Sequence, residues 1–386
     1  MTPNTIDFNA ADAVETLDTL LDRAIGYDEF KCDFRAKYSE FRFTPDMRLS
    51  MAVAPLAFDG NHVMPGTQPV SSVTDVTDHA LGQLYSKLGP VHYGSGSAKT
   101  LPSEYLDGFT PEQRADILNW TLKKAEHHTW RRWGEGSVTI RHYRDTTRAI
   151  LDGNYPRVPN SSLVRMMRDA IADRGNDIGD VKLIRPALDT DALVLKVIWN
   201  DLTNGNDDNL RIGVMVRNGE TGNSALELLP MVQRWSCENS ITVSQKVSRV
   251  GVSVTHFPGQ SAQSLMVQLY ANLPSVMNAS ADLANRMIEA QQVQLPRFRD
   301  VLTGIAIEHG WKNDRLMDDL LDSGREGGRT KAALVNAITY AAHQHPAYDD
   351  FQRVTVEQIG GDVLFADQKW FARMERQGEL GKKVAV

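Results

Sequence analysis

Apolar and polar positions alternate most regularly in residues 210–256, and we build the rest of the predicted fold around this stretch. Every second residue of its first part is apolar, and these positions are Leu210, Ile212, Val214 and Val216. Because successive side chains of a strand point to opposite faces, the pattern predicts one apolar face and one face with Arg211 and Arg217 near its ends. An Asn-Gly turn, a second strand and a segment rich in Val, Ser and Thr complete the prediction.

Other apolar segments predict neighbouring strands. The full set comprises residues 181–188, 193–199, 210–217, 225–232 and 240–256. The connections between these segments contain clusters of Asn, Gly and Asp, most clearly in residues 204–209. Such clusters favour hairpins, whereas parallel pairing would need longer crossover connections. We therefore predict a central antiparallel sheet over residues 181–256.

Helical periodicity flanks this sheet on both sides. The predicted helices before the sheet are residues 6–27, 79–88, 110–128 and 158–172, and residues 30–58 have an extended, aromatic pattern. The third of these helices begins with a capping hydroxyl, a proline and an acid, which is a common helix start. Beyond residue 259 the period is again helical, ending in a predicted helix at residues 365–376.

These patterns predict an α+β fold, with a central antiparallel sheet and packed helices followed by a mainly helical C-terminal part. We divide the chain into an N-terminal helical and extended segment (residues 1–75), an α+β core domain (residues 76–277) and a helical C-terminal part (residues 278–386). A chain of 386 residues is long enough to bury most of the surface that its unfolded form exposes.

Composition narrows the class of protein. Hydrophobic residues make up 41% and charged residues 24% of the chain, as in globular proteins, and no apolar run approaches the ~20 residues of a membrane helix. The first residues carry acids where a signal peptide carries a basic segment, so we expect a cytoplasmic protein, in the host cytoplasm if a phage encodes it. We expect both cysteines, Cys32 and Cys237, to be reduced. The net charge of −7 argues against a globally basic surface but permits a local basic groove.

A basic and aromatic run in residues 123–148 reverses the sign of the chain locally. Its cations are Lys123, Lys124, Arg131, Arg132, Arg141, Arg144 and Arg148, against the acids Glu126, Glu135 and Asp145. Its aromatic residues include Trp130, Trp133 and Tyr143. Surfaces that bind single-stranded nucleic acid combine cations along the backbone path with aromatic faces on which bases stack. The run therefore predicts a nucleic-acid-binding surface.

Two further interpretations of these residues stay open. Arg211, Arg217, Arg234 and Lys246 extend the basic surface if the sheet places them on the same side as the run. Alternatively, the tryptophans are core residues and the arginines pair with the many acids of the chain, because arginine stems often cover apolar surface.

Catalytic and metal-binding patterns are weak. Cys237 and His256 suggest a thiol nucleophile and its base, but a buried strand cysteine is the alternative and the sequence identifies no orienting acid. The close histidine pairs, His127 with His128 and His343 with His345, lack the spacing of a zinc site. The glycine-rich residues 324–331 lack the order of a phosphate-binding loop. We predict no catalytic residue, no metal and no cofactor.

Several short motifs resemble the phage/plasmid-like domain-of-unknown-function family (number 932). The motif residues are Thr77-Asp-His-Ala80 with Gln83, Arg148-Ala-Ile-Leu151 with Tyr155, Arg211 to Arg217 with Asn218 and Gly222, Arg234-Trp-Ser-Cys237-Glu-Asn239, and Asn336 to Tyr340 with Thr330 and His343. Ser240 stands where the family commonly has glycine, so Asn239 would have to adopt the left-handed turn conformation itself. The resemblance spans roughly residues 77–361 and implies a bacteriophage or mobile-element setting without an established reaction.

These observations favour one function over two alternatives. We expect a phage or mobile-element accessory protein of DNA metabolism that binds nucleic acid, single-stranded DNA in particular, and forms a homo-oligomer without membrane contact. The first alternative is a phage structural or assembly protein that makes only protein–protein contacts, consistent with the net negative charge. The second is a thiol-dependent enzyme at Cys237.

Overall fold

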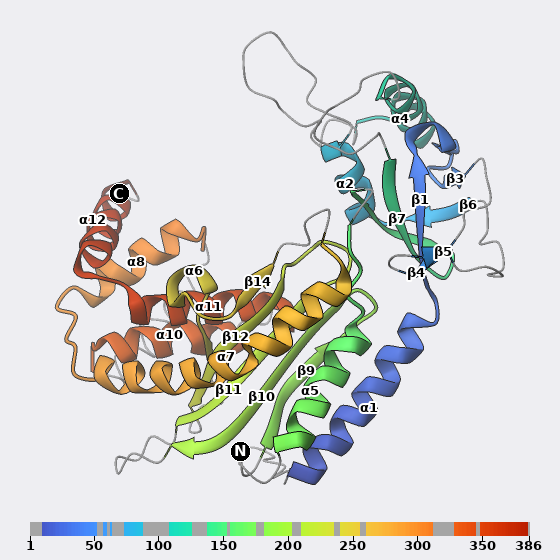
Figure 1. Ribbon diagram of the computed structural model, residues 1–386. Coiled ribbons are helices and arrows are strands. Elements are labelled where there is room, and N and C mark those ends of the chain that lie inside the picture. The colour runs from blue at the N-terminus through green and yellow to red at the C-terminus, as the bar shows by residue number, and fades with distance from the viewer. Residues whose placement is uncertain are drawn as a thin grey trace.

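The computed structural model describes residues 10–51, 57–59, 62–63, 73–87, 108–125, 137–152, 155–174, 181–202, 210–234, 240–254, 260–311, 328–344 and 348–384. Within these residues the chain forms two β-sheets and a set of helices, and the two sheets occupy different parts of the molecule (Figure 1). The fold class is α+β, which confirms the prediction.

An eight-stranded sheet is built from the first 152 residues. Its strands are β1 (Lys31–Lys37), β2 (Phe41–Phe43), β3 (Leu49–Met51), β4 (Ala57–Asp59), β5 (His62–Val63), β6 (Val73–Val76), β7 (Ser137–Tyr143) and β8 (Thr146–Asp152), and their order is β2-β3-β6-β8-β7-β1-β4-β5. The 3-10 helix η1 (Tyr38–Glu40) connects β1 to β2. β1 pairs antiparallel with β7 along its whole length, from Lys31 opposite Tyr143 to Lys37 opposite Ser137.

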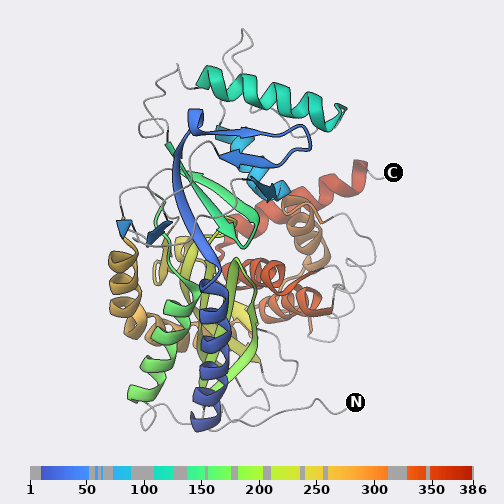
Figure 2. The ribbon, with the colours of Figure 1, turned by 90° about the vertical axis from the view of Figure 1, so that its right-hand side faces the viewer.

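Helices α2 (Asp78–Lys87) and α4 (Pro111–Ala125) cover one face of this sheet. Figure 2 shows α4 lying across the β2–β3 end. The buried residues at this interface include Phe34, Phe41, Phe43, Leu84, Leu118, Ile140 and Ile150. Asn119 of α4 accepts a hydrogen bond from the Phe43 backbone N–H (2.7 Å) and donates one to the Phe43 carbonyl (2.8 Å). Because these bonds satisfy both backbone groups of an edge residue, they fix the helix on the sheet.

The second sheet has six strands, which lie where the sequence predicts the central antiparallel sheet. They are β9 (Val181–Leu188), β10 (Ala192–Leu202), β11 (Leu210–Gly219), β12 (Leu226–Arg234), β13 (Ser240–Thr242) and β14 (Val252–Val254). The order is β13-β12-β11-β10-β9, with β14 paired to β12, and every described pair is antiparallel.

Helices cover both faces of the six-stranded sheet. On one face, α1 (Ala10–Asp28), α5 (Asn160–Arg174) and α7 (Ala262–Ala290) pack against alternate strand residues such as Val197 and Val214. Figure 1 shows these three helices on the same side of the strands. On the other face, Val354 of α11 (Asp350–Phe365) packs against Ile198 and Met215. β11 is therefore buried on both sides, unlike the one-sided strand that the sequence pattern predicts.

The remaining helices form the C-terminal part. They are α6 (Gln245–Ser248), α8 (Phe298–Glu308), α10 (Lys331–Gln344) and α12 (Gln368–Val384). α8 and α12 pack at very short range, because Gly304 lies against the backbone of Met374 and Gly378 lies against the backbone of Asp300. Ion pairs join the same two helices, Arg297 with Glu379 and Arg373 with Glu308.

Several predicted elements are confirmed, and others are wrong. α1, α2, α4 and α5 match predicted helices, and β9 to β12 match predicted strands. The stretch predicted as one strand over residues 240–256 instead forms β13, a helical turn and β14, with residues 255–256 outside the described part. The eight-stranded sheet was not predicted, because its strands are short or carry many charges.

The predicted domain boundaries fall inside elements. The boundary after residue 75 lies within β6, and the boundary after residue 277 lies within α7. Strands from both sides of residue 75 share the eight-stranded sheet, since β1 pairs with β7 and β6 pairs with β8.

Candidate functional site

The face of the eight-stranded sheet opposite α2 and α4 carries cations. Along β1, Phe34 and Ala36 point into the core beneath the helices, so the alternate residues Arg35 and Lys37 point the other way and are exposed. On β2, Phe41 and Phe43 join the same core, which places the exposed Arg42 on the same side as Arg35 and Lys37. We call Arg35, Lys37 and Arg42 the basic sheet face.

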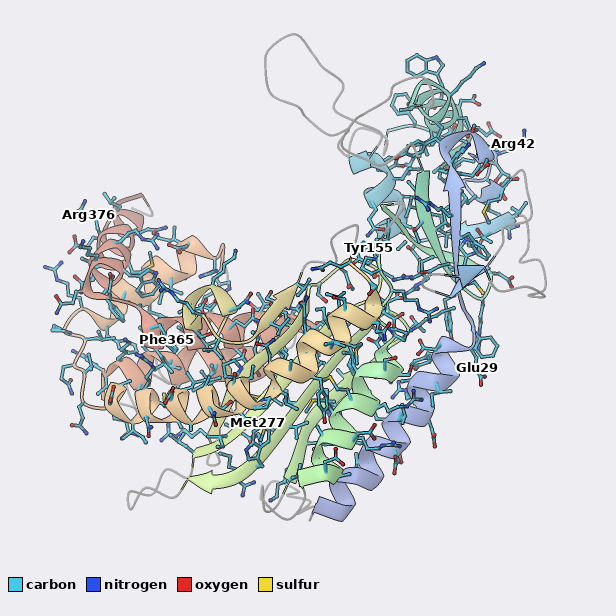
Figure 3. The ribbon with its side chains drawn as sticks, in the orientation of Figure 1. Glu29, Arg42, Tyr155, Met277, Phe365 and Arg376 are labelled. Atoms are coloured by element: carbon cyan, nitrogen blue, oxygen red, sulfur yellow. The ribbon has the colours of Figure 1, made fainter. Side chains whose placement is uncertain are left out.

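Figure 3 shows Arg42 on the outer side of this sheet, away from α2. Lys37 and Arg42 are linked by the short η1, so the basic sheet face follows one continuous bend of the chain. Glu40, the acid within this bend, accepts a hydrogen bond from the Lys37 backbone N–H (2.7 Å). Its carboxylate is therefore engaged with the backbone at the start of η1.

The first half of β1 is covered by the turn between β11 and β12, and this contact joins the two sheets. The Glu220 side chain in that turn is fully buried, and its Oε1 accepts hydrogen bonds from Lys31 Nζ (2.8 Å) and from the backbone N–H of Asn160 (2.9 Å). Asn160 begins α5, where the backbone N–H groups and the helix dipole favour a carboxylate. Arg157 Nε lies 3.6 Å from Glu220 Oε2. We call this contact the joint.

A second buried ion pair lies beside Glu220. Arg141 donates two hydrogen bonds to the Asp33 carboxylate, from Nε (2.7 Å) and Nη2 (2.6 Å), and donates a third to the Glu220 carbonyl. Burial raises the pKa of Asp33, but the Arg141 guanidinium outweighs that effect and holds the pKa below its ordinary value. Burial by itself lowers the pKa of Arg141, but the Asp33 carboxylate has the larger opposite effect. The pKa of Arg141 therefore lies above its ordinary value. Both groups are thus charged in the folded protein.

Asp28 completes the joint on the α1 side. Its carboxylate Oδ1 accepts from Lys31 Nζ (3.0 Å) and from Arg157 Nη2 (3.1 Å). Burial raises the pKa of Asp28, but Lys31, a hydrogen bond from Ser161 and Arg157 together lower it below its ordinary value. Three carboxylates and three cations therefore alternate through the joint.

Some residues of the short motifs described in the sequence lie around this same turn. Gln83 donates to the Thr221 carbonyl (2.6 Å) and accepts from the Ile150 backbone N–H (2.9 Å), so it bridges the turn to β8. His79 Nε2 lies 3.1 Å from the same carbonyl. A Cβ on Gly222, which has φ +76°, would lie close to Gln83 and to the Tyr155 hydroxyl. Motif positions that are remote in sequence thus share one location.

Asn218 and Arg148 tie further elements to the joint. Asn218 donates through Nδ2 to the Val158 carbonyl (2.9 Å) and to Asn160 Oδ1 (2.8 Å). Arg148 donates through Nε to Asp191 in the β9–β10 turn (2.8 Å). His79, Gln83 and Arg148 therefore contact turns of the six-stranded sheet, whereas Asn218 fixes the start of α5 on its own sheet.

The structure disperses the predicted nucleic-acid-binding residues. Lys123 is exposed on α4 and Arg144 is exposed in the β7–β8 turn, whereas Tyr143 is half-buried. Arg148 is half-buried and paired with Asp191. Trp130, Arg131, Arg132 and Trp133 lie outside the described residues, as does the side chain of Lys124.

Four predicted arginines do not form an outward surface. Arg141 is 2% exposed because Asp33 and the Glu220 carbonyl enclose its guanidinium. Arg211 is 8% exposed because helices cover both faces of β11. Arg217 on β11 and Arg234 on β12 are half-buried, and Arg217 Nη1 lies 3.9 Å from Glu227 Oε2. The prediction that these arginines point outward is wrong for Arg141 and Arg211.

The predicted thiol site and the search for a metal site or a membrane helix have the following outcomes. Cys237 and His256 lie outside the described residues, while Cys32 is a free, half-buried thiol whose pKa is raised by burial. In the part of the chain that the structure describes, no group of three His, Cys, Asp or Glu side chains is placed to hold a metal. Among the described helices, none combines the length and apolar character needed to cross a membrane.

The basic sheet face has no counterpart among the predicted site residues. Its signal in the sequence is the alternation Lys31-Cys-Asp-Phe-Arg-Ala-Lys37, in which charged and apolar residues alternate at every position.

Comparisons with protein-family models, with curated proteins and with solved structures find no match to this chain. The function must therefore be argued from the chain's own residues.

Proposed function

We propose that this chain is a nucleic-acid-binding accessory of DNA metabolism from a phage or mobile element, that it acts in the host cytoplasm, and that its ligand is single-stranded DNA. The observation that carries the proposal is the basic sheet face, where Arg35, Lys37 and Arg42 point away from the helices that cover the other side. Phosphate groups bind such cations with release of counterions, even when the net charge of the protein is negative.

The shape of the surface favours an extended strand of nucleic acid. A sheet face presents its side chains in rows about 7 Å apart along each strand, since every second residue points to the same side. Arg35 and Lys37 form such a row along β1, and Arg42 lies on β2, which follows β1 in the chain after η1. The phage or mobile-element setting rests on the resemblance of the short sequence motifs.

Removing the three cations tests the proposal. We expect the variant with Arg35→Ala, Lys37→Ala and Arg42→Ala to bind oligo(dT) more weakly at low salt than the parent. Because each lost phosphate contact on a single strand contributes about 0.7 to the slope of log affinity against log salt, the slope should fall in magnitude by about 2. Fluorescence anisotropy of a labelled oligonucleotide over a salt series measures both quantities.

A matched control removes the same number of charges elsewhere. Lys246, Lys369 and Arg376 are exposed in the C-terminal half, and Figure 3 shows Arg376 at the far end of the molecule. Their triple alanine variant should keep the parental salt slope. Equal losses in the two variants would indicate a non-specific charge effect, and no binding by the parent protein at low salt would refute the proposal.

A second candidate is a structural or assembly protein that forms homo-oligomers through protein contacts. The observation that favours it is the outer side of α7, where Val267 and Tyr270 are 62% and 53% exposed. Residues 260–281 contain no Asp, Glu, Lys, Arg or His, so two negatively charged copies can approach there without repulsion. Light scattering with and without oligo(dT) separates the candidates: an oligomer that is broken by Tyr270→Lys and ignores oligonucleotide would favour this one.

A further inference from the structure

A cluster of aromatic rings and arginines lies where α1 ends and β1 begins. Phe30, Tyr143 and Tyr27 meet edge to face, with Tyr143 centred 6.3 Å from each of the other two rings. The Arg144 guanidinium lies 4.8 Å from the centre of Phe30 and 5.4 Å from the centre of Tyr143. Figure 3 labels Glu29, the residue before Phe30, at this position. We call Phe30, Tyr143 and Arg144 the aromatic corner.

The aromatic corner is open to solvent although it is rich in rings. Phe30 is 47% exposed, and Arg144 is exposed as well. An exposed large ring loses the benefit of burial, so a fold that needed these residues for packing alone would enclose them. The guanidinium over Phe30 instead extends a flat, cationic stacking surface toward solvent.

The backbone of Arg144 is strained. Its φ is +53°, in the left-handed region that glycine adopts most readily, and its N–H donates to the Phe30 carbonyl (3.0 Å). A side chain held in that region costs the fold stability, and such strain concentrates at functional positions. The turn therefore retains arginine where glycine would fit the backbone better.

We propose that the aromatic corner is a stacking subsite for an unpaired nucleobase. The inference rests on the proposed function, because it assigns the base contact of the same ligand whose phosphates bind the basic sheet face. Phe30 directly precedes β1 and Lys37 ends it, so the two residues are about 23 Å apart over seven extended steps of the chain. A base on the aromatic corner would give a preference for single strands over duplexes, in which bases are already stacked.

The test compares oligo(dT) with an oligonucleotide of equal length whose bases are replaced by abasic tetrahydrofuran units. We expect the parent protein to prefer oligo(dT) by roughly fivefold or more, which is the size of one base–aromatic stack. Phe30→Ala and Arg144→Gly should each abolish this preference, while the salt slope set by the basic sheet face changes little. Anisotropy titrations give both values.

Arg144→Gly separates a binding role from a structural role. Because glycine relieves the positive φ, we expect this variant to unfold at the same or a higher urea concentration than the parent. Arg249→Gly is the matched control, because Arg249 also has a positive φ (+57°) and is exposed but lies next to α6 in the other half of the molecule. It should relieve the same strain and leave the preference for bases intact.

The outcomes distinguish the two proposals. If the parent protein binds both oligonucleotides equally, the stacking subsite is wrong while the basic sheet face stands. If Arg144→Gly lowers the unfolding midpoint, Arg144 holds the fold together and the inference also fails. If the parent protein binds neither oligonucleotide at low salt, the proposed function fails and the subsite with it.

Discussion

His142 is a buried histidine that the fold holds in its neutral form. It is 1% exposed, its ring lies edge-on to Phe34 at 4.9 Å, and its Nε2 is 2.9 Å from the Thr147 hydroxyl. Burial lowers the pKa of His142 from 6.5 to about 4, and the nearby Asp33 carboxylate offsets only part of this effect. A proton therefore binds the unfolded chain more tightly than the folded one.

This difference makes stability depend on pH. The folded pKa lies below the unfolded pKa, so the contribution of His142 is complete above about pH 6.5 and is lost as the pH falls toward 4. Across that window the free energy of unfolding should fall by about 1.4 kcal/mol per pH unit from this group. His142→Gln should remove that slope, which urea unfolding at pH 5, 6 and 7 measures.

The range above pH 7 provides the reference for this experiment, because His142 is neutral there in both the folded and unfolded states. Parent and variant curves should run parallel between pH 7 and 8. Burial also lowers the pKa of His309, so a smaller acid slope should persist in the variant. Identical slopes in the two proteins between pH 5 and 6.5 would contradict this account.

For a single residue, the sequence predicts well on which face of a strand the side chain lies. It predicts poorly which other elements cover that face. The alternation in residues 210–217 correctly separates Val214 from Met215, yet Met215 and Arg211 are also buried because α11 and its neighbours close the second face. The predicted surface role of Arg141 fails for the same reason, since Asp33 comes from a strand more than 100 residues earlier. Long-range partners are not visible in local periodicity.

At the scale of elements, the long helices and hairpin strands are predictable because each repeats its own pattern over many residues. β1 and β7 are harder to predict from the sequence, since each strand contains buried charged residues, such as Lys31 and Arg141, among its other positions. In the sequence alone, a charged residue is taken to be exposed to solvent unless the partner that neutralises it in the interior is known. The basic sheet face was missed for this reason, although the alternation that creates it is present in residues 31–37.

The contact between α8 and α12 depends on glycine. A Cβ on Gly304 would collide with the backbone of Met374, so the helices would have to separate. We expect Gly304→Ala to destabilise the protein by about 1–3 kcal/mol through this overpacking, even though alanine favours helices. Urea unfolding of parent and variant measures the difference.

Gly26 provides the opposite case on α1. It lies within a helix, and a Cβ there would meet nothing within 4 Å. Gly26→Ala should therefore stabilise the protein by about 0.5–1 kcal/mol, because only the gain in helix propensity remains. The account of close helix packing would be wrong if both alanine variants changed stability in the same direction.

At the scale of the whole molecule, the joint sets how the two sheets sit relative to one another. The β11–β12 turn reaches from the six-stranded sheet to β1, β7 and β8, where Glu220 and Thr221 contact Lys31, Arg141 and Gln83. Figure 1 shows this turn at the place where the two parts of the molecule meet. The buried charges are paired, so removing one leaves its partners uncompensated.

Glu220→Gln tests the joint. The amide keeps the shape of the carboxylate but removes the fully buried one of the two carboxylates that pair with Lys31 and Arg157, so we expect a loss of about 3–5 kcal/mol in the free energy of unfolding. Hydrogen exchange should increase most in β1, β7 and β8, next to the turn. Glu289→Gln, an exposed position on α7, is the control and should change stability by less than about 0.5 kcal/mol. A similarly small effect at Glu220 would show that the joint is not held by charge.

The pairing of β1 with β7 also has a consequence for synthesis on the ribosome. β1 emerges about 100 residues before β7, so at ~5–20 residues per second the β7 edge of β1 stays unpaired for several seconds. The charges at Lys31, Asp33, Arg35 and Lys37 discourage mispairing with other chains during that interval. Arg35 and Lys37, which belong to the proposed ligand surface in the finished protein, thus also protect the nascent one from aggregation.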